Sequence, residues 1–211
     1  MYNEILQDRK EAAVLLSEKL EKYQGSDSII LAVPRGGVPI GYEIAKNLHL
    51  PLDIILSKKI GHPSNKEFAI GAVSLDTFFL DEHPEIPKAY IEREVKKIRE
   101  SLQDQYNLYM GNRKPADIEG KTVIVVDDGV ATGNTVLACI AILRKSNPKK
   151  IVVAVPVVPF DTVNVFQQKA DEFVYLIASK DFRGVGGFYE EFEQINDDEV
   201  IRMLGVANLA E

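Results

Sequence analysis

Short apolar runs alternate with amphipathic stretches along this chain, and that alternation constrains the fold more than any other feature. Each run is bounded by polar residues, Gly or Pro and predicts a buried strand; the runs lie at residues 28–33, 52–57, 122–126, 151–155 and 173–177. Helices are expected at residues 3–23, 38–48, 87–110, 133–145, 161–169 and 197–204. Strands that alternate with helices form βαβ units, so we expect an α/β fold whose mostly parallel, twisted sheet is flanked by helices.

Two stretches interrupt this pattern. Residues 58–66 are polar and contain Gly and Pro, which predicts a surface loop, and residues 69–81 have the pattern of short strands. A chain of 211 residues can bury one good core, so we expect a single domain over residues 1–211.

Charge and cysteine content exclude several classes of protein. The chain has 25 Lys and Arg against 32 Asp and Glu, a net charge of −7 that disfavours nonspecific nucleic-acid binding. Cys139 is the single cysteine, which excludes an internal disulfide or a multi-cysteine metal site and fits a reducing compartment. The N-terminal residues lack a signal-peptide pattern, and the longest apolar run, at 151–160, is too short to cross a bilayer. We therefore expect a cytoplasmic protein that binds neither nucleic acid nor membrane.

The segment 123–135 carries the strongest chemical signal. A buried strand ends in Asp127 and Asp128, and a loop of small residues then opens a helix. Open parallel sheets bind ligands at this edge. Gly133 allows close backbone approach and the helix N-terminus offers oriented N–H groups, so one phosphate fits the loop.

The two acids suit a ligand with vicinal hydroxyls, held directly or through a divalent cation such as Mg²⁺. A phosphate next to a diol describes ribose 5-phosphate. Taken alone, the acids could form a strand-end turn and Thr132-Gly133 a helix cap. A P-loop and a dinucleotide fingerprint are excluded, because neither Gly-Lys-Ser/Thr nor Gly-x-Gly-x-x-Gly follows a strand.

The strand, acid pair and Thr-Gly-x-Thr at 123–135 resemble the signature of the type I phosphoribosyltransferase family. The resemblance covers about residues 25–180, and it is greatest to uncharacterised predicted phosphoribosyltransferases that share Pro-Arg-Gly-Gly-Val-Pro. The resemblance implies a core domain over about residues 25–180 and a small hood formed by about residues 1–24 and 181–211. It also implies that Asp127 and Asp128 bind the ribose hydroxyls of 5-phosphoribosyl pyrophosphate (PRPP). The 5-phosphate would be held by Ala131, Thr132, Gly133, Asn134 and Thr135.

Two further segments resemble the pyrophosphate-binding parts of the family. Residues 34–37, Pro-Arg-Gly-Gly, follow the first core strand, where the family has a pyrophosphate loop often of unusual peptide geometry. The basic segment after the second strand resembles its mobile catalytic loop. The implied pyrophosphate contacts are Arg35, Gly36, Gly37, Lys58 and Lys59, with His62 as a weaker candidate. Taken alone, the first segment could be a turn and the second a solvated face.

The implied reaction displaces pyrophosphate at C1 of the ribose through an oxocarbenium-like transition state. Asp127 and Asp128 would orient the sugar and offset its positive charge, while Arg35 and Lys59 would neutralise pyrophosphate. These four are the candidate catalytic residues. Mg²⁺ is the expected cofactor, carried mainly by PRPP, with the two acids as candidate ligands.

The acceptor is less well defined. Ala131 stands where hypoxanthine-type members have an Asp, and the strand at 151–155 runs into Pro156 without the Lys that reads a 6-oxopurine. Both departures resemble the adenine-, orotate- and uracil-type members. Phe182 and Tyr189 could stack on an acceptor base, or could pack down within a Gly-rich loop.

The sequence therefore predicts a PRPP-dependent pentosyltransferase of nucleotide metabolism, which transfers the phosphoribosyl group to a nitrogenous acceptor such as a nucleobase. The alternative is a non-catalytic PRPP- or nucleotide-sensing regulatory protein on the same fold. Members of the family commonly form dimers, so the resemblance implies a homodimer. The acid pair and the Lys58-Lys59 segment favour the enzyme.

Overall fold

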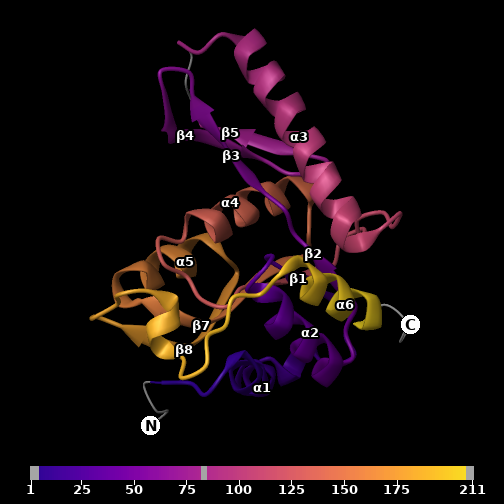
Figure 1. Ribbon diagram of the computed structural model, residues 1–211, viewed down its shortest axis with the longest axis vertical. Coiled ribbons are helices and arrows are strands. Elements are labelled where there is room, and N and C mark those ends of the chain that lie inside the picture. Colours follow the sequence, from indigo (N-terminus) through magenta and orange to yellow (C-terminus); the bar gives the residue numbers. More distant parts are fainter. Residues whose placement is uncertain (1–4, 82–84, 208–211) are drawn as a thin grey trace.

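A five-stranded parallel sheet forms the centre of the molecule (Figure 1). The structure is a computed structural model that describes residues 5–81 and 85–207. Neighbouring strands follow the order β2-β1-β6-β7-β8, and every neighbouring pair is parallel. The strands are β1 (Ser28–Ala32), β2 (Leu52–Ile54), β6 (Thr122–Val126), β7 (Lys150–Pro159) and β8 (Glu172–Ser179).

Helices cover both faces of this sheet. The helices of one face are α1 (Arg9–Lys19) and α2 (Gly37–Leu48), and those of the other are α4 (Asn134–Leu143) and α5 (Val163–Lys169). Side chains of successive strand residues point to opposite faces. Ile124 of β6 therefore packs in the core with α1 and α2, while Val123 and Val125 pack in the core with α4 and α5. The expected α/β fold with a mostly parallel sheet flanked by helices is confirmed.

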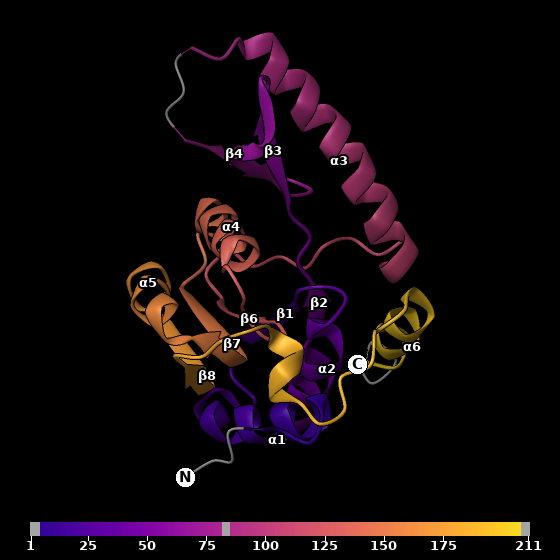
Figure 2. The ribbon, with the colours of Figure 1, turned by 60° about the vertical axis from the view of Figure 1, so that its left-hand side comes forward.

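A second unit extends beyond α4 and is called the arm here (residues 58–81 and 85–110; Figures 1 and 2). It consists of an antiparallel sheet and one long helix. Its elements are β3 (Lys58–His62), β4 (Asn65–Val73), β5 (Phe78–Leu80) and α3 (Lys88–Met110). Both views place α4 between the arm sheet and the core sheet.

The prediction of a surface loop at residues 58–66 is wrong, because β3 and the start of β4 occupy this segment. Lys59 pairs with Ala72 across the hairpin, and Ile60 is fully buried. Backbone pairing and this one apolar anchor outweigh the polar composition, whose charged side chains stay exposed on the strand.

The segment before the first helix runs beside the segment around Tyr189. The first helix begins at Arg9, later than predicted, because the Asp8 side chain caps it by accepting from the Glu11 N–H at 2.8 Å. Leu6 forms an isolated parallel bridge with Tyr189. Residues 3–4 of the predicted helix, and residues 1–4 and 208–211 of the predicted hood, lie outside the described residues.

Two elements near the C-terminus complete the fold. Strand β7 continues past residue 155, where the predicted strand ended. Its pairing with β8 skips Pro156, which has no N–H to donate. Helix α6 (Asp197–Ala207) packs against α2 and α3. None of the described helices is long and apolar enough to span a membrane.

A buried carboxylate, Asp53 of β2, connects the arm to the core sheet. Its side chain accepts hydrogen bonds from the Tyr106 hydroxyl at 3.0 Å and the Ala116 N–H at 2.8 Å. Asp53 is 4% exposed and Tyr106 is fully buried. Because Tyr106 lies in the last turns of α3 and Ala116 in the segment after it, one side chain fixes the base of the arm.

We expect Asp53→Ala to lower the free energy of unfolding by about 2–4 kcal/mol, because it leaves the buried Tyr106 hydroxyl and the buried Ile54 N–H without their acceptor. Tyr106→Phe should cost less, about 1–2 kcal/mol, since Asp53 keeps its backbone partners. Urea unfolding measures both losses. Asp104→Ala, at an exposed position on the same helix, is the control and should change stability little. Equal stability of all three variants would contradict this role of Asp53.

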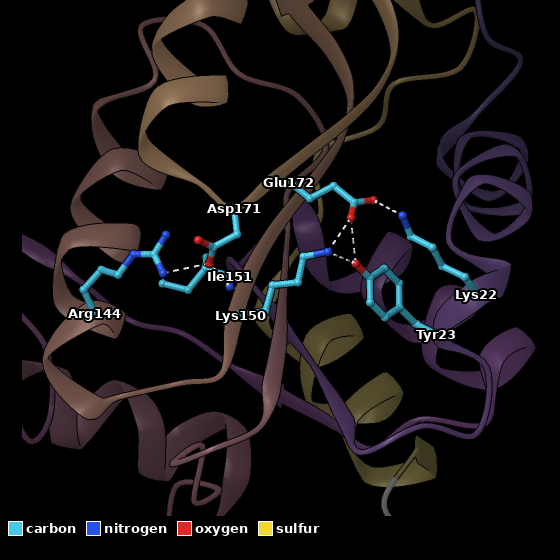
Figure 3. A network of polar contacts seen from close by, with 7 residues as sticks. All are labelled: Lys22, Tyr23, Arg144, Lys150, Ile151, Asp171 and Glu172. Carbon is cyan, nitrogen blue, oxygen red and sulfur yellow. Dashed lines mark hydrogen bonds and ion pairs between the residues drawn. The ribbon is translucent and has the colours of Figure 1, made fainter.

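A polar network joins the amino ends of β7 and β8, opposite the ligand edge predicted from the sequence (Figure 3). Glu172 accepts from Lys150 Nζ at 2.7 Å, from Lys22 Nζ at 2.7 Å and from the Tyr23 hydroxyl at 2.8 Å. Burial raises the pKa of Glu172, but these three partners outweigh it and lower the pKa to about 2.

This lowered pKa gives the stability of the protein a defined acid dependence. The stabilisation by ionised Glu172 is fully present above the unfolded-state pKa, roughly 4.3, and is lost as pH falls towards about 2. We expect Glu172→Gln to cost about 1–2 kcal/mol at pH 7 and progressively less below pH 4. Chemical denaturation across pH measures the difference, with exposed Glu18→Gln as control. A Glu172→Gln loss that stays constant from pH 7 to pH 2 would contradict the role of this charge.

Candidate functional site

The loop between β6 and α4 encloses a small cavity of about 120 Å³. Gly133 precedes α4 with φ of +80°, a conformation that favours glycine. The first N–H groups of a helix have no partner within the helix, so the start of α4 offers them to an anion. All five residues predicted for the phosphate loop line this cavity: Ala131, Thr132, Gly133, Asn134 and Thr135. Its size and donors suit one phosphate.

The acid pair stands between this cavity and a second one. Asp127 lines the phosphate-loop cavity, whereas Asp128 lines the other, which measures about 290 Å³. Asp127 accepts a hydrogen bond from the Asp128 N–H at 2.9 Å. Burial raises the pKa of the Asp127 carboxyl well above its usual range, and the charge of Asp128 adds to the rise. A ligand that reaches into both cavities would therefore pass over the two carboxyls.

Residues 34–37 lie directly against the acid pair, because β1 and β6 are parallel neighbours with Ala32 opposite Val126. The Pro34–Arg35 peptide bond is cis, at the place where the resemblance implied unusual geometry. A Cβ on Gly36 would overlap the Asp128 carboxylate, and one on Gly37 would overlap the backbone of Val126. Glycine at these two positions is what allows the loops to approach so closely.

Arg35 lines the second cavity together with Gly36 and Asp128. Its side chain is 41% exposed, and its ion pair is a long one of 3.7 Å to Asp197 at the start of α6. Asp197 also accepts a 2.6 Å hydrogen bond from the Tyr109 hydroxyl of α3. The guanidinium of Arg35 is therefore loosely held and accessible to an anion in this cavity.

The structure separates the three basic candidates of residues 58–62. Lys59 forms a 2.8 Å ion pair with Glu67 and lines a cavity of about 850 Å³ between the arm and α4, together with Asn134 and Thr135 of the phosphate loop. Lys58 points to the opposite side of the strand and donates to Ser101 of α3 at 2.7 Å.

His62 is directed towards its own hairpin turn, where its Nδ1 accepts from the Ser64 N–H at 3.1 Å. Of these three candidates, the structure thus brings Lys59 to the side of the phosphate loop. It directs Lys58 and His62 elsewhere, because successive residues of a strand face opposite ways and His62 lies at the hairpin end.

The aromatic residues proposed to stack on an acceptor are occupied by protein contacts. Phe182 stacks on Phe188 with ring centroids 5.3 Å apart. Tyr189 is 6% exposed, stacks on Phe192 and donates its hydroxyl to the Asp128 carbonyl at 2.7 Å. Burial raises the pKa of Tyr189, so this donor stays protonated. The packed alternative considered for this Gly-rich loop describes both residues, and Tyr189 supports the backbone of the site.

Arg9 is a residue of the site that sequence analysis missed. It comes from α1, more than a hundred positions before the acid pair, yet its Nη2 and Nε lie 2.7 and 3.0 Å from Asp128 Oδ2. Nη1 donates to the Glu193 carbonyl at 2.9 Å. Within a stretch that reads as an ordinary amphipathic helix, no local pattern marks this arginine.

Comparison with known proteins places this geometry in a family. A model of the phosphoribosyl transferase domain matches residues 1–171. The crystal structure of TT1426 from Thermus thermophilus is similar with a TM-score of 0.85 and 35% identity, over 95% of this chain and 97% of that one. The sequence is 34% identical over 210 residues to "Putative phosphoribosyl transferase Rv0571c" of Mycobacterium tuberculosis, and the matched region covers 97% of this chain and 47% of that protein. The chain thus spans about half the length of this curated relative.

The close approach of the two loops gives a testable expectation for Gly36. Gly36→Ala should lower the free energy of unfolding by about 1–3 kcal/mol, because the added methyl must displace the Asp128 carboxylate or the loop. Urea unfolding measures the loss. Gly187→Ala is the matched control, since a Cβ there meets nothing within 4 Å, and it should change stability by less than about 0.5 kcal/mol. If both variants are equally stable, the approach of the loops is looser than described.

Proposed function

This chain belongs to the phosphoribosyltransferase family, and we propose that it transfers the 5-phosphoribosyl group of PRPP to a nitrogenous acceptor with release of pyrophosphate. The observation that carries the proposal is the position of the acid pair, between a phosphate-sized cavity at the start of α4 and a second cavity walled by Arg35. A 5-phosphorylated ribose with a charged group at C1 matches that order of groups.

The phosphate and the sugar have separate anchors in this proposal. The 5-phosphate binds the N–H groups at the start of α4 and the hydroxyls of Thr132 and Thr135. Asp127 and Asp128 accept hydrogen bonds from the ribose hydroxyls. As the bond at C1 breaks, positive charge develops on the sugar, and the nearby carboxylates stabilise it.

The leaving group needs positive charge and N–H donors. Arg35 can turn from its long contact with Asp197 to a phosphate oxygen, and the loop of Gly36 and Gly37 presents backbone donors. Lys59 would approach from the arm after exchanging Glu67 for pyrophosphate.

Magnesium fits this site as a cation that arrives with PRPP. Among residues 5–81 and 85–207, no cluster of three or more acidic, His or Cys side chains could hold a metal ion. The oxygen donors available for Mg²⁺ are the carboxylates of Asp127 and Asp128, so its other ligands would be pyrophosphate oxygens and water. Bound there, Mg²⁺ would supply positive charge that offsets the charge of the leaving pyrophosphate.

Calorimetric titration with PRPP, with and without Mg²⁺, tests the first half of the proposal. Ribose 5-phosphate and AMP are the comparison ligands. Magnesium-dependent binding supports the assignment, and pyrophosphate release with an acceptor from a nucleobase panel then establishes transfer. Adenine, orotate and uracil belong at the head of that panel, because Ala131 provides no carboxylate for a 6-oxopurine. Tight PRPP binding without release from any acceptor would instead favour a sensing protein.

The acid pair gives the matching variant. Asp127→Asn combined with Asp128→Asn should weaken Mg²⁺–PRPP binding by at least about a hundredfold, since both carboxyl groups that accept from the ribose hydroxyls are lost. Calorimetry measures the affinity, and circular dichroism checks that the fold is retained. Asp161→Asn, an exposed change in the short 3-10 helix before α5, is the control and should bind like the unmodified protein. Unchanged affinity in the double variant would overturn the site assignment.

A further inference from the structure

We infer that Arg9 is a positioning residue, which holds the Asp128 carboxylate in the orientation that receives the ribose hydroxyls. This inference rests on the proposed function, because it assigns Arg9 a role in the same site. It gives the N-terminal helix α1 a part in substrate recognition that the family signature at 123–135 does not include.

The contact between the two side chains is both short and directional. Two donors of one guanidinium, Nε and Nη2, meet the same oxygen, Asp128 Oδ2, at 3.0 and 2.7 Å. None of the described residues donates a hydrogen bond to the other oxygen, Oδ1. The pair thus fixes one oxygen of the carboxylate and leaves the second available to a ligand in the adjacent cavity.

Arg9 is itself held from three directions. Its Nη1 donates to the Glu193 carbonyl at 2.9 Å, and its guanidinium lies 3.9 Å from the centre of the Phe192 ring. Tyr189 is part of the same group of contacts, because it stacks on Phe192 and donates its hydroxyl to the Asp128 carbonyl. Arg9 therefore connects the N-terminal helix, the C-terminal segment and the acid pair in one contact.

Burial indicates that the effect of this pair is positional. The side chains of Arg9 and Asp128 are 10% and 15% exposed, so both charges are largely removed from water. For such a pair, the cost of desolvation offsets much of the attraction, and the net gain in stability is small. What remains is a fixed geometry for Asp128, which Gly36 allows by leaving room for its carboxylate.

The experiment separates recognition of the ribose from recognition of the phosphate. Ribose 5-phosphate and inorganic phosphate are titrated calorimetrically into the unmodified protein, Arg9→Gln and Asp128→Asn. Inorganic phosphate reports on the loop at α4 alone, whereas ribose 5-phosphate also needs the acids. We expect Arg9→Gln to weaken ribose 5-phosphate about tenfold and inorganic phosphate less than about twofold.

Three further variants keep the test decisive. Lys10→Gln, an exposed change on the same helix, should leave both affinities unchanged. Phe192→Leu keeps the arginine but removes the ring beneath it, so it should shift the ratio of the two affinities in the same direction by a smaller factor. Thermal melting shows whether Arg9→Gln folds, and if it does not, Phe192→Leu takes its place in the test. Adding Arg9→Gln to Asp128→Asn should cause little further loss, because the two residues act through one contact.

The outcomes distinguish this inference from the proposed function. If the unmodified protein prefers ribose 5-phosphate to inorganic phosphate, and the folded Arg9 or Phe192 variant keeps that preference in full, the role of Arg9 is overturned and the proposed function stands. If the unmodified protein itself shows no preference for ribose 5-phosphate, the proposed function fails, and the role of Arg9 fails with it. A selective loss of the preference supports the inference.

Discussion

The parallel pairing of β1 with β6 is the constraint on which the rest of the site depends. Because Ala32 lies opposite Val126, the chain leaves both strands at the same edge, and the Pro-Arg-Gly-Gly loop and the acid pair emerge side by side. Two cores, one on each face, hold this register, since Val123 and Val125 pack against one pair of helices and Ile124 against the other. A slip by one residue would exchange the faces of every side chain, so the apolar strands fix the relative positions of the two loops.

The remaining parts of the site are brought in by segments far away in the sequence. The bridge between Leu6 and Tyr189 aligns the segment before α1 with the segment around Tyr189, and this alignment places Arg9 beside Asp128. The arm is attached in a comparable way, through the buried contact of Asp53 with Tyr106, and it carries Lys59 to the side of the phosphate loop. The core sheet thus provides the anion-binding loops, while segments attached by hydrogen bonds to the core or to each other complete the walls.

The parts that sequence analysis predicts correctly are those encoded locally. Five continuous apolar runs predict five parallel strands, and the residues from Asp127 to Thr135 predict their own loop, because strand, turn and helix start follow one another. The loop prediction at residues 58–66 fails, since the strand there depends on the β4 partner and on one buried residue, Ile60. Arg9 carries no signal, because its importance comes from a contact with a residue more than a hundred positions away. The role of Tyr189 in the packing is equally hidden, because the sequence of a Gly-rich segment with aromatic residues does not show whether the rings pack within the protein or stack on a ligand.

Charge within the site explains why a protein of net charge −7 can hold a polyanion. Around the second cavity, Arg9 and Asp128 neutralise each other, which leaves Arg35 as a loosely paired cation at its wall. The phosphate loop contributes N–H groups rather than side-chain charge, and such donors act whatever the net charge of the chain. In the proposed reaction, the positive charge that offsets a departing pyrophosphate would therefore come from three sources. These are Arg35, Lys59 once it leaves Glu67, and a divalent cation that enters with the substrate. On this view, the site is built to recognise a substrate that brings its own counter-charge, and the fixed pairs around it serve to aim the carboxylates.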